Sequence, residues 1–147
     1  MKVRYADKRD FTWLTEIDHH VSSAWVSRCL VNNEYLICER QSVRAGFLRH
    51  SLFWGEIPYM DMIFVLEHQR CVGVGTALFA FWERMMKTSG AKILMTSSET
   101  EEKDAQEWHR RNGFEESGQL TFGQFQPSRE TFFIKNLQTQ DGQLLRI

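Results

Sequence analysis

The sequence has little of what marks several large classes of protein. Its three cysteines, Cys29, Cys38 and Cys71, stand far apart, so no disulfide framework is visible. With two prolines and no Pro/Gly/Ser-rich stretch there is no sign of a linker, and we expect one domain, residues 1–147. No apolar run approaches the roughly 20 residues of a membrane-spanning helix, so no membrane partner is expected. No apolar stretch follows the charged start, so no signal peptide is expected. The odd number of widely spaced cysteines favours a reducing cytoplasm.

An excess of charge of one sign is also missing. The formal net charge is -1, whereas a nucleic-acid-binding domain usually carries a strongly basic face, so no nucleic-acid partner is expected. Hydrophobic residues make up 42% and charged residues 25%, which is ordinary usage for a globular domain. The length is sufficient to bury one hydrophobic core.

Hydrophobic periodicity predicts a mixed α/β domain. We expect strands at 2–6, 34–40, 43–53, 57–66, 91–97, 114–120 and 129–135. Two helices should follow the first strand, one after Asp10 as its cap and one from Ser22 or Ser23. The clearest helix has Val74, Ala77, Leu78, Phe81, Trp82 and Met85 on one face and ends at Gly90. The strands on either side of it should pair in parallel through a right-handed crossover.

A last short helix is predicted near residues 105–112. Asp104 to Glu107 resembles a capping box, and Ala105, Trp108 and Asn112 would lie on one side. Gly113 should stop this helix. The tail from Gln138 onward carries little signal.

The strongest functional signal is a glycine-containing turn between a buried strand and the long helix. The segment Arg70-Cys71-Val72-Gly73-Val74-Gly75-Thr76 stands where that helix begins. A helix start presents backbone N–H groups without intrahelical partners, and glycine lets an anion approach the backbone closely. The segment is therefore suited to a pyrophosphate, with Arg70 as an additional cation. A tight strand–helix turn without a ligand is the alternative.

Two familiar nucleotide motifs do not fit this turn. The P-loop requires Gly-Lys-Ser/Thr, but Thr76 follows Gly75 directly. The dinucleotide fingerprint requires a third glycine where Leu78 stands. Neither an ATP site nor a nicotinamide site is predicted.

The turn resembles a known coenzyme motif. The pattern Arg70-x-x-Gly73-x-Gly75 is similar to the acetyl-CoA motif of the GNAT N-acetyltransferase superfamily, Gln/Arg-x-x-Gly-x-Gly/Ala at the same junction. Residues 105–114 (AQEWHRRNGF) resemble the later helix of that family, Ala-x-x-Phe-Tyr followed by Gly-Phe. The two motifs stand in the family's order, and the resemblance covers roughly residues 57–120.

This resemblance implies a fold, a coenzyme and a reaction. The fold would be GNAT-like, with a mixed, mostly antiparallel sheet, splayed fourth and fifth strands and about four helices. Acetyl-CoA would be the co-substrate, and its acetyl group would pass by direct attack to a primary amine of a small molecule or a peptide. A homodimer is compatible with the resemblance, since dimers are common in the superfamily.

The resemblance also implies which residues bind the coenzyme. The pantothenic arm would pair with the main chain around Ile63, Phe64 and Val65, and an N–H near Val65 would face the thioester carbonyl. The pyrophosphate would lie on the N–H groups from Cys71 to Thr76. The expected coenzyme-binding set is Ile63, Phe64, Val65, Arg70, Cys71, Val72, Gly73, Val74, Gly75 and Thr76.

The candidate general acid departs from the family pattern. Where the family often has Phe-Tyr, with the Tyr protonating the leaving thiolate, this chain has Trp108-His109. An imidazolium of pKa about 6.5 is strong enough to protonate a thiolate of pKa about 8.5, and a neutral ring can still donate a hydrogen bond. A surface histidine is the alternative. The missing Tyr also leaves open a CoA-binding module without transferase activity.

The general base is less well indicated. Asp61 alternates with Ile63 and Val65 on the strand at 57–66, and a carboxylate paired with an arginine is its alternative role. Glu99, just past the next strand, is a second candidate, and a solvated loop charge is its alternative.

Other motifs have simple interpretations. His68-x-x-Cys71 has no second pair at metal-site spacing, so no metal is expected. His19-His20 could line the acceptor cleft or be exposed loop histidines. Trp25, Trp54 and Phe125 could line that cleft, although aromatic residues are more often core.

Overall fold

The computed structural model describes residues 1–137, and the tail from Gln138 lies outside the described residues. The elements follow the predicted order. The strands are β1 (Lys2–Tyr5), β2 (Tyr35–Arg40), β3 (Val43–Phe53), β4 (Ile57–Val65), β5 (Ile93–Glu99), β6 (Glu115–Leu120) and β7 (Glu130–Asn136). The helices are α1 (Phe11–Ile17), α2 (Ser23–Val31), α3 (Val74–Thr88) and α4 (Lys103–Arg111), with short 3-10 turns η1 (Lys8–Asp10), η2 (Glu67–Gln69) and η3 (Gly123–Phe125).

The seven strands are hydrogen-bonded in the order β1-β2-β3-β4-β5-β7-β6. β4 and β5 pair in parallel at Tyr59–Met95 and Met60–Thr96, as the predicted crossover requires. β1 with β2, β2 with β3, β5 with β7 and β6 with β7 are antiparallel. The mixed, mostly antiparallel α/β sheet predicted from the sequence is therefore confirmed.

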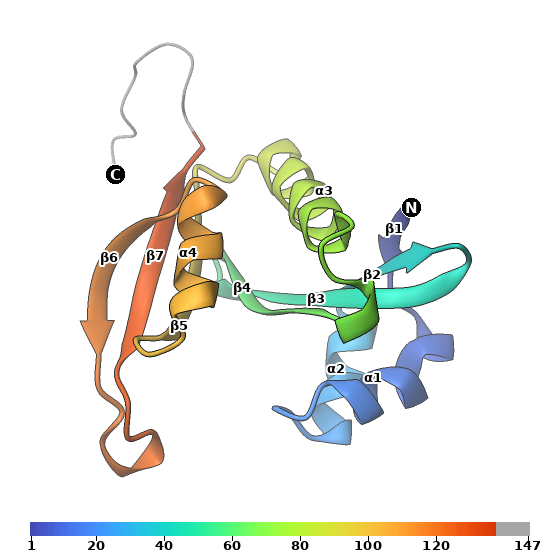
Figure 1. Ribbon diagram of the computed structural model, residues 1–147, viewed down its shortest axis with the longest axis horizontal. Coiled ribbons are helices and arrows are strands. Elements are labelled where there is room, and N and C mark those ends of the chain that lie inside the picture. The colour runs from blue at the N-terminus through green and yellow to red at the C-terminus, as the bar shows by residue number, and fades with distance from the viewer. Residues whose placement is uncertain (138–147) are drawn as a thin grey trace. The chain divides into compact units, whose positions relative to one another are not determined.

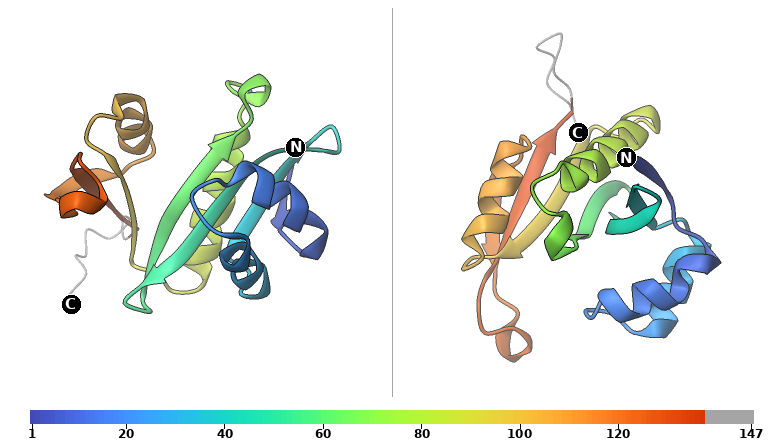
Figure 2. Two further views of the ribbon diagram at one scale, coloured as in Figure 1. Left: turned by 90° about the horizontal axis from the view of Figure 1, so that it is seen from below. Right: turned by 45° about the vertical axis from the view of Figure 1, so that its right-hand side comes forward.

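The described chain forms two compact units. The first contains Met1–Ser51 and Met62–Met85, and the second contains Leu52–Asp61 and the described chain from Met86 onward. In the first unit, α1 and α2 lie on one face of β2 and β3 and α3 lies on the other (Figure 1, Figure 2). In the second unit, α4 lies along β5 and β7, and β6 is the outer strand (Figure 1).

The core of the first unit packs α1 and α2 against β2 and β3. Its buried members are Ala6, Leu14, Val26, Cys29, Tyr35, Ile37 and Phe47. A buried polar contact ties the same elements together: Asp18 accepts a hydrogen bond from Tyr35 Oη at 2.7 Å and another from Arg49 Nε at 2.8 Å. Burial, and then the bond to Asp18, raises the pKa of Tyr35, so this tyrosine stays protonated and acts as a donor.

The long helix α3 was predicted with the correct inner face. Val74, Leu78 and Trp82 are buried. Ala77, Phe81 and Met85 from the same predicted face are half-buried, and Phe79 is buried as well. Gly90 has the left-handed φ of 91° that a helix-ending glycine adopts.

Of the three expected helix caps, one makes a side-chain cap bond and two do not. Ser22 caps α2 and accepts a hydrogen bond from Trp25 N–H at 3.1 Å. Asp10 stands at the cap position of α1 as predicted, but its carboxylate makes no cap bond there and instead accepts bonds from Arg4, Arg44 and the Asp7 N–H. α4 starts earlier than predicted and has no side-chain cap, so the capping box expected from Asp104 is absent.

Candidate functional site

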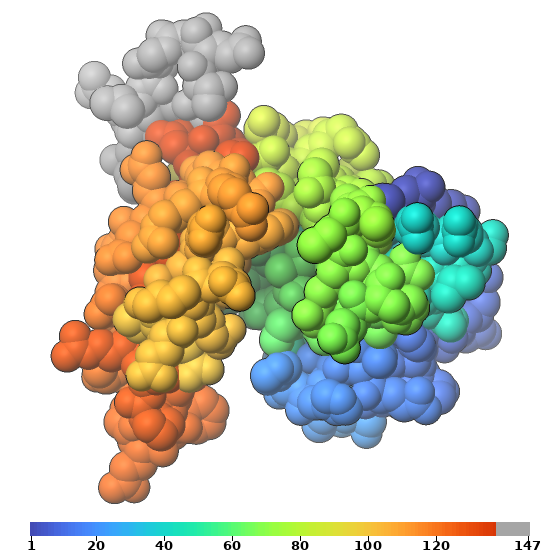
Figure 3. Space-filling model, viewed as in Figure 1, coloured from blue at the N-terminus to red at the C-terminus, as the bar shows by residue number. Residues whose placement is uncertain are grey.

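The predicted coenzyme turn lies at the end of β4 in the first unit. After η2, the chain passes through left-handed backbone at Cys71 (φ 63°) and Gly73 (φ 95°), and α3 then begins at Val74. Ala77 N–H donates to Gly73 O at 2.9 Å. The N–H groups of residues 74–76 lie in the first turn of α3, where the helix offers no carbonyl four residues earlier to accept them. They are therefore open to an anion. Figure 3 shows this green segment at the surface. We call residues 63–65 and 70–76 the coenzyme cradle.

Backbone and side-chain contacts support the coenzyme cradle. Leu66 N–H donates to Ala45 O at 2.9 Å, which continues the contact between β3 and the end of β4. Arg40 Nη1 donates to the buried Gln69 Oε1 at 3.2 Å, which fixes η2. Val74 is buried, so the first residue of α3 is anchored while its neighbours Gly73 and Thr76 remain exposed.

The Arg70 side chain is partly used within the protein. Its Nε donates to Val65 O at 3.2 Å, so the guanidinium bridges the strand end and the turn. From the sequence, Arg70 is expected to contact a phosphate. In the structure one of its donors binds the carbonyl of Val65, a residue expected to lie beside the thioester.

A glycine that the sequence analysis did not single out is essential to this geometry. A Cβ on Gly46 of β3 would lie 2.5 Å from Phe64 O and 3.2 Å from Val65 Cα. It would also lie 3.2 Å from Val74 Cγ1. The first contact is with backbone and cannot be relieved by a rotamer change. A lone glycine inside a strand pattern often marks a close backbone approach, and that was the available signal.

A group of polar side chains gathers in the second unit. Tyr59 of β4 hydrogen-bonds Ser97 of β5, and Ser97 Oγ donates to Glu130 Oε2 of β7 at 2.6 Å. Gln126 Nε2 donates to Glu130 Oε1 at 3.0 Å. Ser128 donates to Glu99. We call these residues the polar cluster: Tyr59, Ser97, Glu99, Gln126, Ser128 and Glu130.

The polar cluster occupies the face of the second unit that α4 leaves uncovered. Glu99 and Glu130 are directly opposite on β5 and β7, and Ser97 is opposite Phe132, so these side chains share one face. Phe133 points to the other face, where His109 of α4 packs with a ring-centroid distance of 5.2 Å. Two like charges directly across a ladder are unfavourable, and the donors from Gln126 and Ser128 offset this by satisfying one carboxylate each.

The candidate acid His109 is buried, which the sequence analysis did not expect. It is 4% exposed and packs against Trp108, Phe114 and Phe133. Burial, with a smaller effect of the Arg110 charge, lowers its pKa to about 4. Its Nδ1 has no hydrogen-bond partner. At neutral pH the ring is therefore uncharged, and a neutral N–H donor is the form available to a reaction.

The other candidates fall into different surroundings. Asp61 is half-buried on β4, and its charge contributes to the raised pKa of Tyr59. The predicted alternative for Glu99, a solvated loop charge, does not hold, because Ser128 binds it at the end of β5. His19 and His20 are exposed.

Three aromatic residues that were expected either to line the acceptor cleft or to lie in the core are exposed. Trp25 is 44%, Trp54 80% and Phe125 90% exposed, so none of them is core. All three cysteines are free. Within residues 1–137 no cluster of metal-ligating side chains is present, and no helix there has the length and apolar character to cross a membrane.

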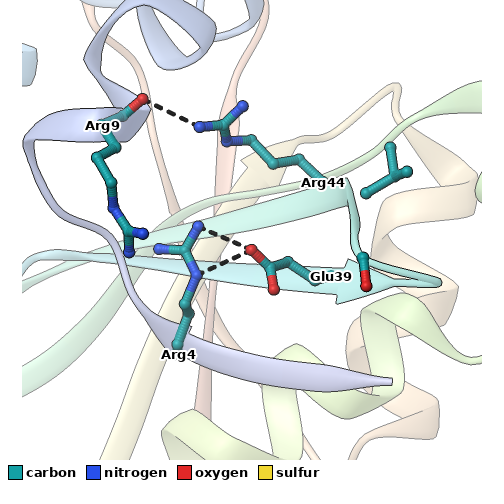
Figure 4. A pocket seen from close by; sticks show the side chains of 6 residues that line it. Arg4, Arg9, Glu39 and Arg44 are labelled. Carbon is teal, nitrogen blue, oxygen red and sulfur yellow. Dashed lines mark hydrogen bonds and ion pairs between the residues drawn. The ribbon is translucent and has the colours of Figure 1, made fainter.

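A charged pocket of about 300 Å³ lies at β1, η1 and the β2–β3 hairpin (Figure 4). Arg4 pairs with the buried Asp10 at 2.8 Å and with Glu39 at 3.0 Å, and Arg44 pairs with Asp10 at 2.8 Å. Arg9 pairs with Asp7 at 2.7 Å. Burial works against ionisation of Asp10, but the bonds from Arg4, the Asp7 backbone and Arg44 outweigh it and lower its pKa. Each arginine of the pocket already pairs with a carboxylate, so we infer that these ion pairs stabilise the first unit.

Comparison with known proteins supports the predicted resemblance. Residues 3–114 match the profile of the family described as Acetyltransferase (GNAT) family. A search of the curated proteins found no match.

Solved structures share the fold at low identity. Ribosomal-protein-alanine N-acetyltransferase from Brucella melitensis is 21% identical, with 93% of this chain and 100% of that chain covered and a TM-score of 0.79. YncA from Salmonella typhimurium, solved with its cofactor acetyl-CoA, is 20% identical, with 95% of each chain covered and a TM-score of 0.75. Arabidopsis thaliana Naa50, in complex with the bisubstrate analogue CoA-Ac-MVNAL, is 14% identical, with 92% and 97% covered and a TM-score of 0.77.

Proposed function

Because the chain belongs to the acetyltransferase (GNAT) family, we propose that it transfers the acetyl group of acetyl-CoA to a primary amine of a small molecule or peptide. The observation that carries this proposal is the coenzyme cradle. Its left-handed turn at Cys71 and Gly73 presents open N–H groups at the start of α3, which suits a pyrophosphate. The ligands of YncA and Naa50, acetyl-CoA and a CoA bisubstrate analogue, support the same coenzyme.

The reaction requires a neutral amine, a polarised thioester and a proton for the leaving thiolate. The amine attacks the thioester carbonyl directly, the N–C bond forms, and the C–S bond breaks with its electron pair on sulfur. A main-chain N–H near Val65 would stabilise the developing oxyanion. His109, if it serves the thiolate, would do so as a neutral donor, because burial lowers its pKa to about 4.

The test is release of free CoA from acetyl-CoA with a panel of amines. The panel contains polyamines, free amino acids, amino sugars and pentapeptides with a free amino terminus or an internal lysine. We expect at least one amine to be acetylated. Tight acetyl-CoA binding with no transfer to any amine would instead support the alternative of a CoA-binding module.

A pair of substitutions tests the contribution of His109 to transfer. His109→Ala removes the ring, and His109→Tyr restores the residue that the family often has. If neither changes the rate or its pH dependence, His109 has no acid role and its function is packing. A selective loss in His109→Ala that His109→Tyr restores would support the donor role.

A further inference from the structure

The charged pocket of the first unit has more positive than negative charge on its walls. It has a volume of about 300 Å³ and is lined by Arg4, Arg9, Glu39, Ser42, Val43 and Arg44. Three of these side chains are cationic and one is anionic. The cations come from β1, η1 and β3 and point into the same space (Figure 4). A concave site with converging guanidinium groups is suited to an anionic ligand.

Two of the three arginines keep part of their hydrogen-bonding capacity. A guanidinium carries five N–H donors, and all five of Arg4 are engaged within the protein. Arg44 uses one donor for Asp10 Oδ1 at 2.8 Å and one for Arg9 O at 3.0 Å. The Arg9 side chain uses its Nε and one Nη2 hydrogen for Asp7. Within residues 1–137 these are the only hydrogen bonds of the Arg9 and Arg44 side chains, so each has three N–H groups left for a ligand.

The two arginines with free donors differ in how firmly they are held. Arg44 pairs with the fully buried Asp10, and its Cζ lies 5.8 Å from the centroid of the Trp13 ring, so its position is fixed before a ligand arrives. Arg9 pairs with Asp7 at the surface, where the two side chains are 70% and 46% exposed. An exposed ion pair contributes little to stability, so Arg9 can turn toward an anion at small cost.

The turn that carries Ser42 has a strained backbone. Gln41 has a φ of 54° and Ser42 a φ of 63°, so both central residues of the β2–β3 hairpin are left-handed. A hairpin turn of this kind favours Asn-Gly, because glycine adopts it without strain. The Gln-Ser pair instead places a hydroxyl at the pocket. Strain of this kind is often retained where the side chain has a function.

We propose that this pocket binds a phosphate group, either inorganic phosphate or the phosphate of a small phosphorylated compound. Its oxygens accept hydrogen bonds from the free N–H groups of Arg9 and Arg44 and from the Ser42 hydroxyl. A phosphate offers more acceptor oxygens than a carboxylate, and as a dianion it is attracted more strongly by the three guanidinium groups. The site lies wholly within the first unit, and it is independent of the proposed function.

The experiment is isothermal titration calorimetry with inorganic phosphate at low ionic strength, where exposed charges are screened least. Glycerol 3-phosphate and acetate are the further probes. Arg9→Gln is the main variant, because Arg9 pairs only at the surface. Ser42→Gly removes the hydroxyl and the backbone strain together, and Arg111→Gln, at an exposed position of α4, is the matched control. Backbone amide spectra locate the bound phosphate, either at residues 39–44 or at residues 71–76.

We expect the natural protein and Arg111→Gln to bind phosphate with the same Kd, and the amide shifts to lie at residues 39–44. The Kd should rise about 10-fold in Arg9→Gln, as is typical of a lost charge-assisted hydrogen bond. Ser42→Gly should bind about 3-fold more weakly and yet be at least as stable in thermal unfolding, because glycine relieves the turn. Tighter binding of glycerol 3-phosphate than of inorganic phosphate would identify a phosphorylated compound as the ligand, and equal binding would identify free phosphate.

Several outcomes would overturn the phosphate site. They are an absence of phosphate binding, equal Kd values for Arg9→Gln and Arg111→Gln, and amide shifts confined to residues 71–76, which would place the phosphate on the coenzyme cradle. Acetate binding as tightly as phosphate would overturn the assignment to a phosphate group. The titration contains neither acetyl-CoA nor an amine, so its failure leaves the proposed acetyl transfer standing. Failure of the amine panel likewise leaves the phosphate site standing.

Discussion

The two units present their functional groups in different ways. In the first unit the coenzyme cradle consists mostly of backbone: open N–H groups at the start of α3, left-handed residues at Cys71 and Gly73, and a strand approach that Gly46 permits. In the second unit the polar cluster consists of side chains from three strands and a loop, joined by hydrogen bonds such as those to Glu130 at 2.6 and 3.0 Å. A backbone site depends on local conformation, whereas a side-chain cluster depends on strand register. The two should therefore respond to different kinds of substitution.

The largest expected effect is on the backbone site. Gly73→Val places a β-branched residue at φ 95°, a conformation that costs about 1–3 kcal/mol, and it crowds the N–H groups. We expect acetyl-CoA affinity to fall about 100-fold, the equivalent of roughly 2.7 kcal/mol, measured by isothermal titration calorimetry.

Gly55→Val is the matched control for this substitution. Gly55 also has a left-handed φ, 71°, but stands in the β3–β4 turn of the second unit with nothing within 4 Å of an added Cβ. It should lose comparable stability and keep its affinity. Equal loss of affinity in both variants would show that general strain, rather than the cradle, determines binding.

The second largest effect is expected at Gly46, which lies against the β4 part of the coenzyme cradle. Gly46→Ala forces a Cβ to within 2.5 Å of Phe64 O, so the β4 backbone must shift. Overpacking of this kind costs about 1–3 kcal/mol, and we expect chemical denaturation to show a loss of that size together with weaker acetyl-CoA binding. Ser117→Ala, at an exposed position of β6, is the comparison and should be close to neutral. Unchanged affinity in Gly46→Ala would mean that the end of β4 can shift without disturbing the cradle.

A third prediction concerns the buried histidine of the second unit. The pKa of His109 is about 4 in the folded chain and about 6.5 when unfolded, so the unfolded chain binds the extra proton between these values. Stability therefore falls as the pH falls through this window, by about 1–2 kcal/mol for this residue at pH 5.

His109→Phe removes that titration and the unpartnered Nδ1. We expect unfolding free energies within about 1 kcal/mol of the natural protein at pH 7, and a variant that is relatively more stable at pH 5. His50 of the first unit, whose pKa burial also lowers to about 4, is unchanged in both proteins, so the difference isolates His109. Parallel pH–stability curves would contradict the assigned burial of His109.

The smallest expected effect concerns the short parallel ladder in the second unit. The buried Thr96 Oγ1 donates to Met60 O at 2.9 Å. Thr96→Val keeps the shape and removes this bond, at a cost of about 1 kcal/mol, with acetyl-CoA affinity unchanged. Thr121→Val, at an exposed position, should be close to neutral. A large loss of acetyl-CoA affinity in Thr96→Val would show that the two kinds of site are not independent.

The sequence by itself determined the elements and the turn that precedes α3, because both depend on neighbours within a few residues. Helical periodicity located α3 and its inner face, and Arg70-x-x-Gly73-x-Gly75 marked the turn from which α3 begins. The match to the acetyltransferase family over residues 3–114 agrees with the predicted resemblance.

Only the tertiary structure decided which side chains meet. Tyr59, Ser97 and Glu130 are 38 and 33 residues apart, and their contact depends on the pairing of β5 with both β4 and β7. The same holds for His109, whose charge state is set by burial against Phe114 and Phe133. A one-residue change of register reverses the face of every strand side chain, so long-range clusters of this kind cannot be read from local pattern.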